Sequence, residues 1–219
     1  MSRQKQKKFR ETFERHNVLE PGKPLYETIK GKWNEVQFNN NFPITLELAC
    51  GRGEYSVGMA RMFKDRNFIG IDIKGDRIWK GSGIALDENI ENVAFLRTDI
   101  SFLEKFFEKD EVDEIWITFP DPRPKLRDAK RRLTSPRYLE LYKKVINKNG
   151  FVKFKTDNTD LFEYTLEVLS ERTDIVNLEH TFDVYNSELA PETYGIKTRY
   201  EAIFTTESNT IKYLKFKFV

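Results

Sequence analysis

The feature that most constrains the fold of this chain is an alternation, from residue 44 onward, of short apolar runs with segments of helical period. This alternation predicts strands at 44–49, 67–71, 93–97, 112–119 and 151–156, and helices between them at 54–64, 74–88 and 136–148. Ser135 before Pro136 is typical of a helix start, and Gly150 of the end of that helix. A helix at 159–170 and strands at 175–184 and 211–218 follow. Strands that alternate with helices predict a parallel sheet with helices on both faces.

The first residues differ in character from the rest of the chain. Residues 1–10 carry five cations and no acid: Arg3, Lys5, Lys7, Lys8 and Arg10. We expect residues 1–17 to form a basic, flexible N-terminal arm, either a solubilising tail or an RNA-phosphate contact. With 219 residues, 39% of them hydrophobic and 33% charged, the chain is long enough for one sizeable core. Residues 18–219 are therefore expected to form a single domain.

Composition excludes several classes of protein and site. One cysteine, Cys50, rules out an internal disulfide, and the only histidines, His16 and His180, lie too far apart to predict a metal site. No apolar run approaches the roughly 18 residues that span a membrane, so we expect a cytoplasmic protein with no membrane partner. The net charge of +2 is too small to indicate a nucleic-acid partner, which must be argued from where the charges lie.

Carboxylates follow the predicted strands at the points where they end. They are Glu47, Asp72, Asp99, Asp121 and Asp157, one for each of the first five strands. Ligands of an open parallel sheet bind beyond the carboxyl ends of its strands. Because five carboxylates along one edge repel one another, we expect a ligand there that is cationic or rich in hydrogen-bond donors.

The turn Gly51-Arg52-Gly53 lets a ligand approach the backbone closely, but Glu47 and Glu54 beside it would repel a pyrophosphate, which disfavours NAD. S-adenosylmethionine instead presents a sulfonium, an ammonium, ribose hydroxyls and an adenine amine. Glu47 with Gly51 and Gly53 suits its methionine end, Asp72 the ribose and Asp99 the adenine. The sequence therefore favours S-adenosylmethionine as the cofactor.

The stretch 119–133 joins a carboxylate to a dense basic loop. Pro120, Pro122 and Pro124 restrict the backbone, so Asp121 is expected on a stiff exit from its strand. Six cations face the single acid Asp128: Arg123, Lys125, Arg127, Lys130, Arg131 and Arg132. Such a run is either a solvated loop or a binding site for an anion such as RNA phosphate.

These motifs together resemble the tRNA (guanine-N7)-methyltransferases over roughly residues 44–218. The resemblance rests on Leu-Glu-Leu-Ala-Cys-Gly-Arg-Gly at 46–53, Ile-Gly-Ile-Asp at 69–72, the whole of 119–133 and Thr-Arg-Tyr-Glu at 198–201. The first two are shared by all class I methyltransferases, whereas the Pro-Asp-Pro-x-Pro-Lys run with its Lys-Arg-Arg-Leu tail is highly specific. Three positions depart from the usual family pattern: Arg123 stands where Trp is common, Asp128 where His is common, and Asp72 where Glu is common.

The resemblance implies a Rossmann-like class I methyltransferase fold, with a mostly parallel seven-stranded sheet, helices on both faces and a C-terminal antiparallel strand. It implies S-adenosylmethionine-dependent methylation of N7 of a variable-loop guanine in tRNA. The donor contacts that it implies are Glu47, Asp72, Asp99 and Asp121. The substrate contacts that it implies are Lys125, Asp157, Thr198, Arg199, Tyr200 and Glu201, with Arg127, Lys130, Arg131 and Arg132 on the RNA.

The chemistry fits the absence of a histidine or cysteine from these motifs. Guanine N7 presents a lone pair in the neutral base, so catalysis is mainly positioning. Attack makes the purine cationic, and a carboxylate beside the base, Asp121 or Asp157, can stabilise this charge. We assign Asp121 as the catalytic residue, in this role rather than as a general base. Two other classes stay open: a methyltransferase for another RNA base or a small molecule, and a non-catalytic RNA-binding module. The chain is expected to act as a monomer or homodimer.

Overall fold

The computed structural model describes residues 3–204 and 210–219, so the first two residues of the predicted arm lie outside the described residues. Its centre is one eight-stranded sheet in the order β1-β4-β3-β2-β5-β6-β8-β7. The strands are β1 Val18–Leu19, β2 Ile44–Leu48, β3 Asn67–Asp72, β4 Val93–Arg97, β5 Val112–Thr118, β6 Ile146–Thr156, β7 Ile175–Thr181 and β8 Lys212–Phe218. The last strand, β8, runs antiparallel to both of its neighbours, β6 and β7, and the other paired strands run parallel. The predicted, mostly parallel sheet with a C-terminal antiparallel strand is confirmed.

The sequence predicts seven strands, and the additional strand in the structure is β1. It has two residues and pairs with β4 through Val18 and Leu19. A two-residue run carries no periodicity, so only tertiary pairing distinguishes it from a loop.

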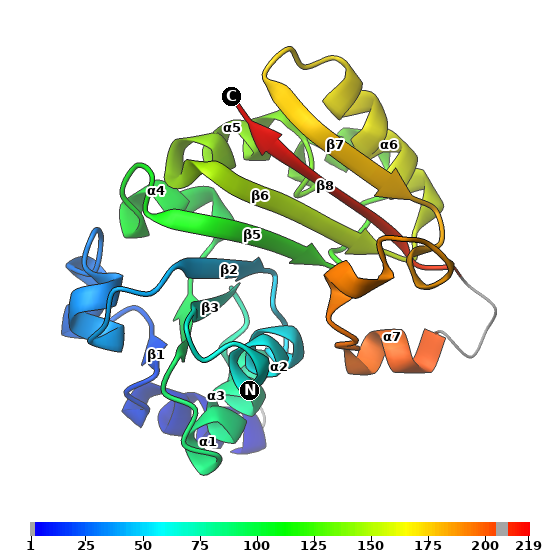
Figure 1. Ribbon diagram of the computed structural model, residues 1–219. Coiled ribbons are helices and arrows are strands. Elements are labelled where there is room, and N and C mark those ends of the chain that lie inside the picture. The colour runs from blue at the N-terminus through cyan, green and yellow to red at the C-terminus, as the bar shows by residue number, and fades with distance from the viewer. Residues whose placement is uncertain (1–2, 205–209) are drawn as a thin grey trace.

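Helices cover both faces of the sheet (Figure 1). They are α1 Arg3–Glu14, α2 Glu54–Met62, α3 Gly75–Asp87, α4 Leu103–Phe106, α5 Pro136–Val145, α6 Thr159–Ser170 and α7 Arg199–Phe204. Short 3-10 helices lie between them: η1 Pro24–Glu27, η3 Ile100–Phe102, η4 Leu126–Arg131, η5 Val184–Asn186 and η6 Ala190–Thr193. A π-helical η2 spans Trp33–Phe38. Side chains alternate along each strand, so Ile115 and Ile117 of β5 join the core under α5 and α6, whereas Trp116 joins the core under α2 and α3.

The N-terminal residues differ from the flexible arm that the sequence predicts. Residues 3–14 form α1, which packs on α3. Trp79 Nε1 donates to Glu11 at 2.5 Å, Arg15 Nη1 donates to Ser82 Oγ at 2.7 Å, and the ammonium of Lys8 lies 4.8 Å from the Trp79 ring centroid. These partners lie about 70 residues away in the sequence, which is why composition alone indicated an arm.

The helix that Gly150 was expected to end finishes earlier, at Val145, and β6 begins at Ile146 and continues through Gly150. A Cβ atom at position 150 would lie 2.5 Å from Ile146 Cγ1 and 2.7 Å from the Asp113 carbonyl oxygen. Glycine is required here by close packing inside the strand and not by a helix end.

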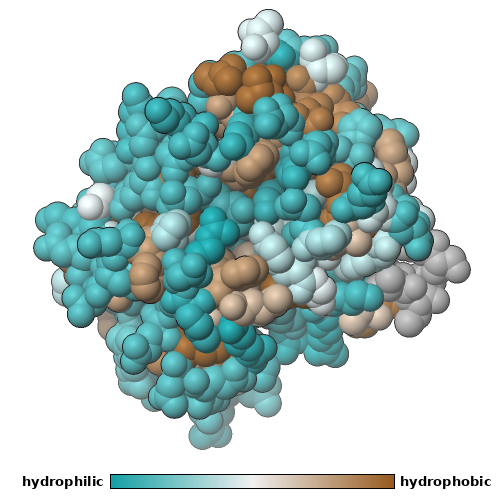
Figure 2. Space-filling view, viewed as in Figure 1, coloured by the Kyte–Doolittle hydropathy of each residue, from teal (hydrophilic) through white to brown (hydrophobic). Residues whose placement is uncertain are grey.

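The strand order reverses between β2 and β5, because β2 pairs with β3 on one side and with β5 on the other. In open α/β sheets such a switch point opens a crevice at the carboxyl ends of the strands. The surface is mainly hydrophilic, with apolar side chains gathered near the C-terminus and the start of β7 (Figure 2). Within the described residues, no helix has the length and apolar character needed to cross a membrane.

Candidate active site

Two adjoining cavities open at the switch point, with Ala49 in the wall of both. The first, of about 550 Å³, is lined by Asp72, Asp99 and Asp121. The second, of about 420 Å³, is lined by Glu47 and Gly51 on one side and by residues 198–200 on the other. The structure therefore brings together the acids at the carboxyl ends of β2, β3, β4 and β5.

The turn after β2 has a left-handed backbone, with φ of 58° at Ala49, 55° at Gly51 and 69° at Gly53. A Cβ on Gly53 would lie 2.4 Å from the Phe95 ring, so a side chain there would displace the core. The Gly51 amide donates to Asp72 Oδ2 at 2.9 Å, and the Lys74 amide donates to Asp72 Oδ1 at 2.8 Å. Asp72 thus fixes the glycine turn while lining the first cavity.

Glu47 lies at the base of the second cavity and is only 2% exposed. Its carboxylate accepts hydrogen bonds from the Ser56 amide at 2.8 Å, from Thr118 Oγ1 at 2.7 Å and from the Ser56 hydroxyl. Burial outweighs these bonds and raises the pKa of Glu47 to about 7. A cationic ligand above it would favour the ionised form.

This raised pKa predicts a pH-dependent stability. The folded protein keeps the Glu47 proton to about pH 7, whereas the unfolded chain releases it near the ordinary pKa of 4.5. The folded state therefore binds more protons between these values, and its free energy of unfolding falls as the pH rises through them. Between about pH 4 and about pH 8, the free energy of unfolding of the wild type should fall by about 3 kcal/mol more than that of Glu47→Gln. Urea unfolding of both proteins checks this, and parallel pH curves would contradict it.

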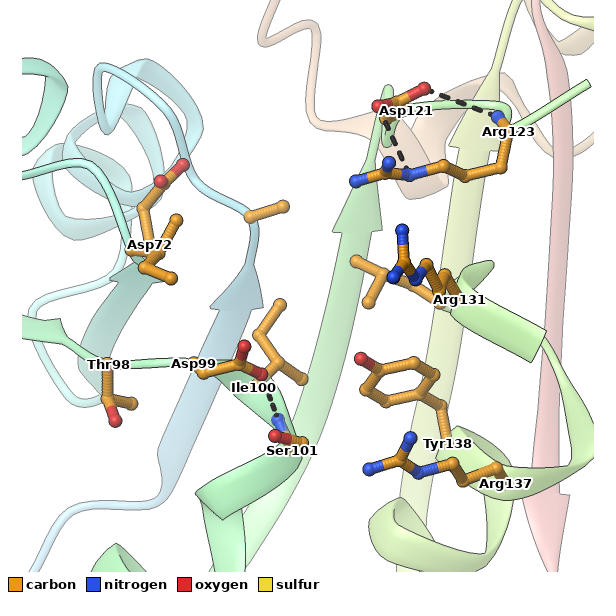
Figure 3. Close-up of a pocket in the computed structure, with 13 residues that line it drawn as sticks. Asp72, Thr98, Asp99, Ile100, Ser101, Asp121, Arg123, Arg131, Arg137 and Tyr138 are labelled. Atoms are coloured by element: carbon orange, nitrogen blue, oxygen red, sulfur yellow. Dashed lines mark hydrogen bonds and ion pairs between the residues drawn. The ribbon is translucent and has the colours of Figure 1, made fainter. Parts of the chain in front are cut away.

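Asp99 and Asp121 face the first cavity from β4 and β5 (Figure 3). Asp99 accepts from the Ser101 amide at 2.8 Å and caps η3, with the rest of its carboxylate exposed. Asp121 accepts from the Arg123 amide at 3.2 Å, and its Oδ2 lies 3.2 Å from Arg123 Nε. The arginine that replaces the usual family residue at position 123 thus pairs with the proposed catalytic carboxylate, whose side chain keeps 63% of its surface exposed.

Sequence reasoning missed the wall of this cavity opposite Asp72. Figure 3 shows Tyr138 and Arg137 projecting from α5 on the side facing Asp72 and Asp99. Burial first, and the charge of Asp99 second, raise the pKa of Tyr138, so its hydroxyl stays protonated and can donate. The only sequence signal for these two residues was their position in the first turn of the helix that follows the basic loop.

The basic loop divides into exposed and buried cations. Lys125, Arg127, Lys130 and Arg131 are exposed, and Arg131 Nη1 lies 3.5 Å from Asp128 Oδ1. Arg132, which was expected to contact RNA, is only 8% exposed. Its guanidinium donates to the Arg123 carbonyl oxygen at 3.2 and 3.3 Å and lies 4.2 Å from the Tyr164 ring centroid. The side chain is thus placed to hold the loop against α6.

We predict that Arg132→Met destabilises the fold, because it removes two charged hydrogen bonds and a cation–π contact. The free energy of unfolding should fall by about 2 kcal/mol or more. Arg131→Met, a neighbouring change at an exposed side chain, should alter it by less than about 0.5 kcal/mol. Chemical denaturation of the two variants makes the comparison, and equal effects would contradict the role given to Arg132.

Of the remaining predicted substrate residues, Thr198, Arg199 and Tyr200 line the other wall of the second cavity, whereas Asp157 and Glu201 line neither cavity. Thr198 Oγ1 accepts from the Glu201 amide at 3.1 Å at the start of α7, and the Arg199 amide donates to Glu54 Oε2 at 2.8 Å. Tyr200 OH donates to Asp157 Oδ2 at 3.2 Å. Glu201 is fully buried and bonds to Lys155 beneath the cavity.

In the part of the chain that the structure describes, no group of three or more His, Cys, Asp or Glu residues could hold a metal ion.

Comparison with known proteins agrees with this geometry. A family described as "Putative methyltransferase" matches residues 41–214. A tRNA (guanine-N(7)-)-methyltransferase of Cytophaga hutchinsonii is 46% identical over 100% of this chain and 99% of its own length. The protein of the same name in Christiangramia forsetii is 44% identical, over 99% of this chain and 98% of its own. This chain belongs to the tRNA (guanine-N(7)-)-methyltransferase family.

Membership of the tRNA (guanine-N(7)-)-methyltransferase family confirms the resemblance read from the sequence motifs. More distant relatives include the protein of that name from Listeria monocytogenes, 38% identical over 88% of this chain and 87% of its own.

Solved structures support the fold. The 16S rRNA methyltransferase KamB aligns with a TM-score of 0.63 at 12% identity, covering 87% of this chain and 94% of its own. A 16S rRNA (adenine(1408)-N(1))-methyltransferase variant with cosubstrate SAM aligns with a TM-score of 0.57 at 10% identity, covering 86% and 90%. The Rossmann-like class I methyltransferase fold is therefore confirmed.

Proposed function

We propose that the protein transfers the methyl group of S-adenosylmethionine to N7 of a guanine in tRNA. The observation that carries this proposal is the position of Asp121. It shares a cavity with Asp72 and Asp99, and it also begins the segment that presents the exposed cations Lys125 to Arg131. A donor site and an RNA-binding loop thus meet at one carboxylate.

The crevice suits the donor in shape and in charge. Asp72 and Asp99 can accept hydrogen bonds from ribose hydroxyls and from the adenine amine, because each carboxylate has lone pairs beyond its present bonds. Gly51 lets the methionine part approach the backbone, and Glu47 lies below it as a counter-charge. Gly53, which was expected beside the donor, instead lets the turn pack against Phe95. When bound there, S-adenosylmethionine supplies the electrophilic methyl group.

The protein's own part in the reaction is positioning and charge stabilisation. Guanine N7 carries a lone pair in the neutral base, so no proton is removed before attack. Holding N7 in line with the methyl carbon replaces a bimolecular encounter by a pre-aligned one. The purine becomes cationic as the bond forms, and Asp121 lies where its negative charge stabilises that state.

The target guanine must be exposed. The major groove of an A-form helix is too narrow for side chains to reach N7, so a loop guanine is required, and we assign the variable loop. Lys125, with Asp157 and residues 198–200 across the cavity mouth, is proposed to contact the nucleotide. Arg127, Lys130 and Arg131 are proposed to contact the neighbouring phosphates.

Methyl transfer from labelled S-adenosylmethionine to unmodified tRNA tests the proposal. We expect the label in 7-methylguanosine after digestion of the tRNA to nucleosides. Label in another nucleoside would indicate a methyltransferase for a different base, and tRNA binding without transfer would indicate an RNA-binding module.

The proposal includes the setting in which the protein acts. The sequence predicts a single domain over 18–219; because α1 packs on α3, we propose that this domain also includes α1, and that the protein acts as a monomer or homodimer in the cytoplasm. Light scattering after size-exclusion chromatography, with and without tRNA, gives the oligomeric state directly.

A further inference from the structure

Two buried lysines lie on the same face of β6. Lys153 is 4% exposed and Lys155 is fully buried, and their spacing of two residues places both side chains under the segment 184–204 that joins β7 to β8. A buried ammonium requires a counter-charge and hydrogen-bond acceptors. Each of these lysines finds an acid in that segment.

Lys153 holds the first half of the segment. Its ammonium lies 3.0 Å from Glu192 Oε2, 3.0 Å from Glu114 Oε2 and 3.1 Å from the Tyr194 hydroxyl. Neither Lys153 nor Glu192 lines either of the two cavities. This pair therefore supports the fold away from the site.

Lys155 holds the second half, which carries α7. Its ammonium lies 2.8 Å from Glu201 Oε1 and 3.0 Å from Glu201 Oε2, and it donates to the Tyr185 hydroxyl at 3.0 Å. The Tyr185 hydroxyl in turn donates to Glu201. The same ammonium lies 5.8 Å from the Phe119 ring centroid, and Phe119 lines the second cavity. The pair thus lies directly beneath the cavity wall.

The helix above this pair depends on tertiary contacts. α7 has six residues, too few to be stable as an isolated helix. It carries Arg199, Tyr200 and Ile203 into the wall of the second cavity. Its bonds to Glu54 and Asp157 lie at the surface, whereas Glu201 is completely buried. The buried pair is therefore well placed to fix the position of α7 against β6.

We propose that Glu201 is a positioning residue, whose buried ion pair with Lys155 holds α7 in place so that residues 198–200 form the substrate-side wall of the cavity. This differs from the sequence expectation that Glu201 touches the nucleotide. It rests on the proposed function, since the substrate of that wall is taken to be the target nucleotide.

Glu201→Gln tests the proposal with almost no change in side-chain shape, because it leaves the Lys155 ammonium buried without a counter-charge. Hydrogen exchange measured by mass spectrometry should speed up in peptides covering α7. The kcat/KM for tRNA should fall by roughly 100-fold, the scale expected for a misplaced wall. Unchanged exchange in α7 would overturn the proposal.

The double variant Lys155→Met/Glu201→Gln separates positioning from direct contact. Removing both charges takes away the unpaired ammonium, so slow exchange in α7 should return and kcat/KM should recover at least about tenfold over Glu201→Gln. If Glu201 instead bound the nucleotide itself, its carboxylate would be missing from the single and the double variant alike. The change at Lys155 would then restore no activity. Full loss in the double variant, with α7 ordered, would therefore overturn the proposal.

Glu192→Gln is the matched control. It also removes an acid of the same segment from a buried lysine of β6, but Lys153 keeps Glu114 as its counter-charge. Exchange in α7 and kcat/KM should stay close to wild type. An effect equal to that of Glu201→Gln would mean that any damage to the segment suffices, which would also overturn the proposal.

The exchange measurement needs no substrate. If the wild-type protein transferred no methyl group to tRNA, the proposed function would fail, while the exchange patterns of the variants would still report whether the pair holds α7.

Discussion

Replacing Asp121 with asparagine should lower kcat for methyl transfer to tRNA by about 100- to 1,000-fold, the range for removing one group that stabilises developing charge. The change keeps the size of the side chain and removes its negative charge from beside the reacting base. The fold should be unaffected, because the carboxylate is largely exposed and both its hydrogen bond and its ion pair go to Arg123, two residues along the same loop. Single-turnover kinetics with saturating tRNA measure the loss.

Asp128→Asn is the control for this change. Asp128 lies on the same loop and also pairs with an arginine, Arg131, but it does not line the first cavity. An exposed ion pair of this kind contributes little to stability, so turnover should change by less than about threefold. If Asp121→Asn retained wild-type turnover, or if both variants lost it equally, the charge-stabilising role of Asp121 would be wrong.

The second large effect concerns the exposed cations of the basic loop. Changing Arg127, Lys130 and Arg131 to alanine should make the plot of log K for tRNA binding against log salt concentration less steep. Its slope should fall in magnitude by roughly two to three, about 0.7 to 0.9 for each phosphate that is no longer neutralised. At about 0.1 M salt this corresponds to roughly 100-fold weaker binding. Donor affinity should hardly change. Filter binding or fluorescence titration across a series of salt concentrations provides the slope.

A triple alanine change at Lys30, Lys109 and Lys144 is the matched control. These exposed lysines border a hollow beside α4 and the end of α5, and none of them lines either cavity of the site. This control removes the same net charge, so it reproduces any general electrostatic effect of the charge change on tRNA binding. An equal fall of the slope in both triple variants would show that the basic loop has no special part in docking.

The outline of the fold followed from local patterns in the sequence. The predicted bounds of β4 and α6 agree with the structure, because each element has clear boundaries. Residues 93–96 are an apolar run that follows Asn92, and Asn158 caps the helix by accepting from the Leu161 amide. The acids at the strand ends were found for the same reason. Parallel strands bring their carboxyl ends to one edge, so strand register alone places Asp72, Asp99 and Asp121 together.

What the sequence missed depends on contacts between distant residues. Arg132 reads as one more cation of the loop, and only the position of Tyr164 on α6 shows that it packs inward. Glu201 reads as part of a motif beside the substrate, yet its partner Lys155 lies 46 residues earlier on β6. Likewise the N-terminal residues read as a basic arm until Trp79 and Ser82 of α3 are seen to bond to Glu11 and Arg15. Burial of a charge cannot be inferred from composition, because its partner can come from any element.

A crystal structure of the protein with S-adenosylhomocysteine tests most directly the claim that the crevice between β2 and β5 holds the methyl donor. The account predicts ribose hydroxyls within hydrogen-bond distance of Asp72 and the adenine amine beside Asp99. It also predicts that the sulfur lies in the first cavity, on the side of Asp121. A nucleoside bound elsewhere, or bound in this crevice with its sulfur directed away from Asp121, would contradict the account.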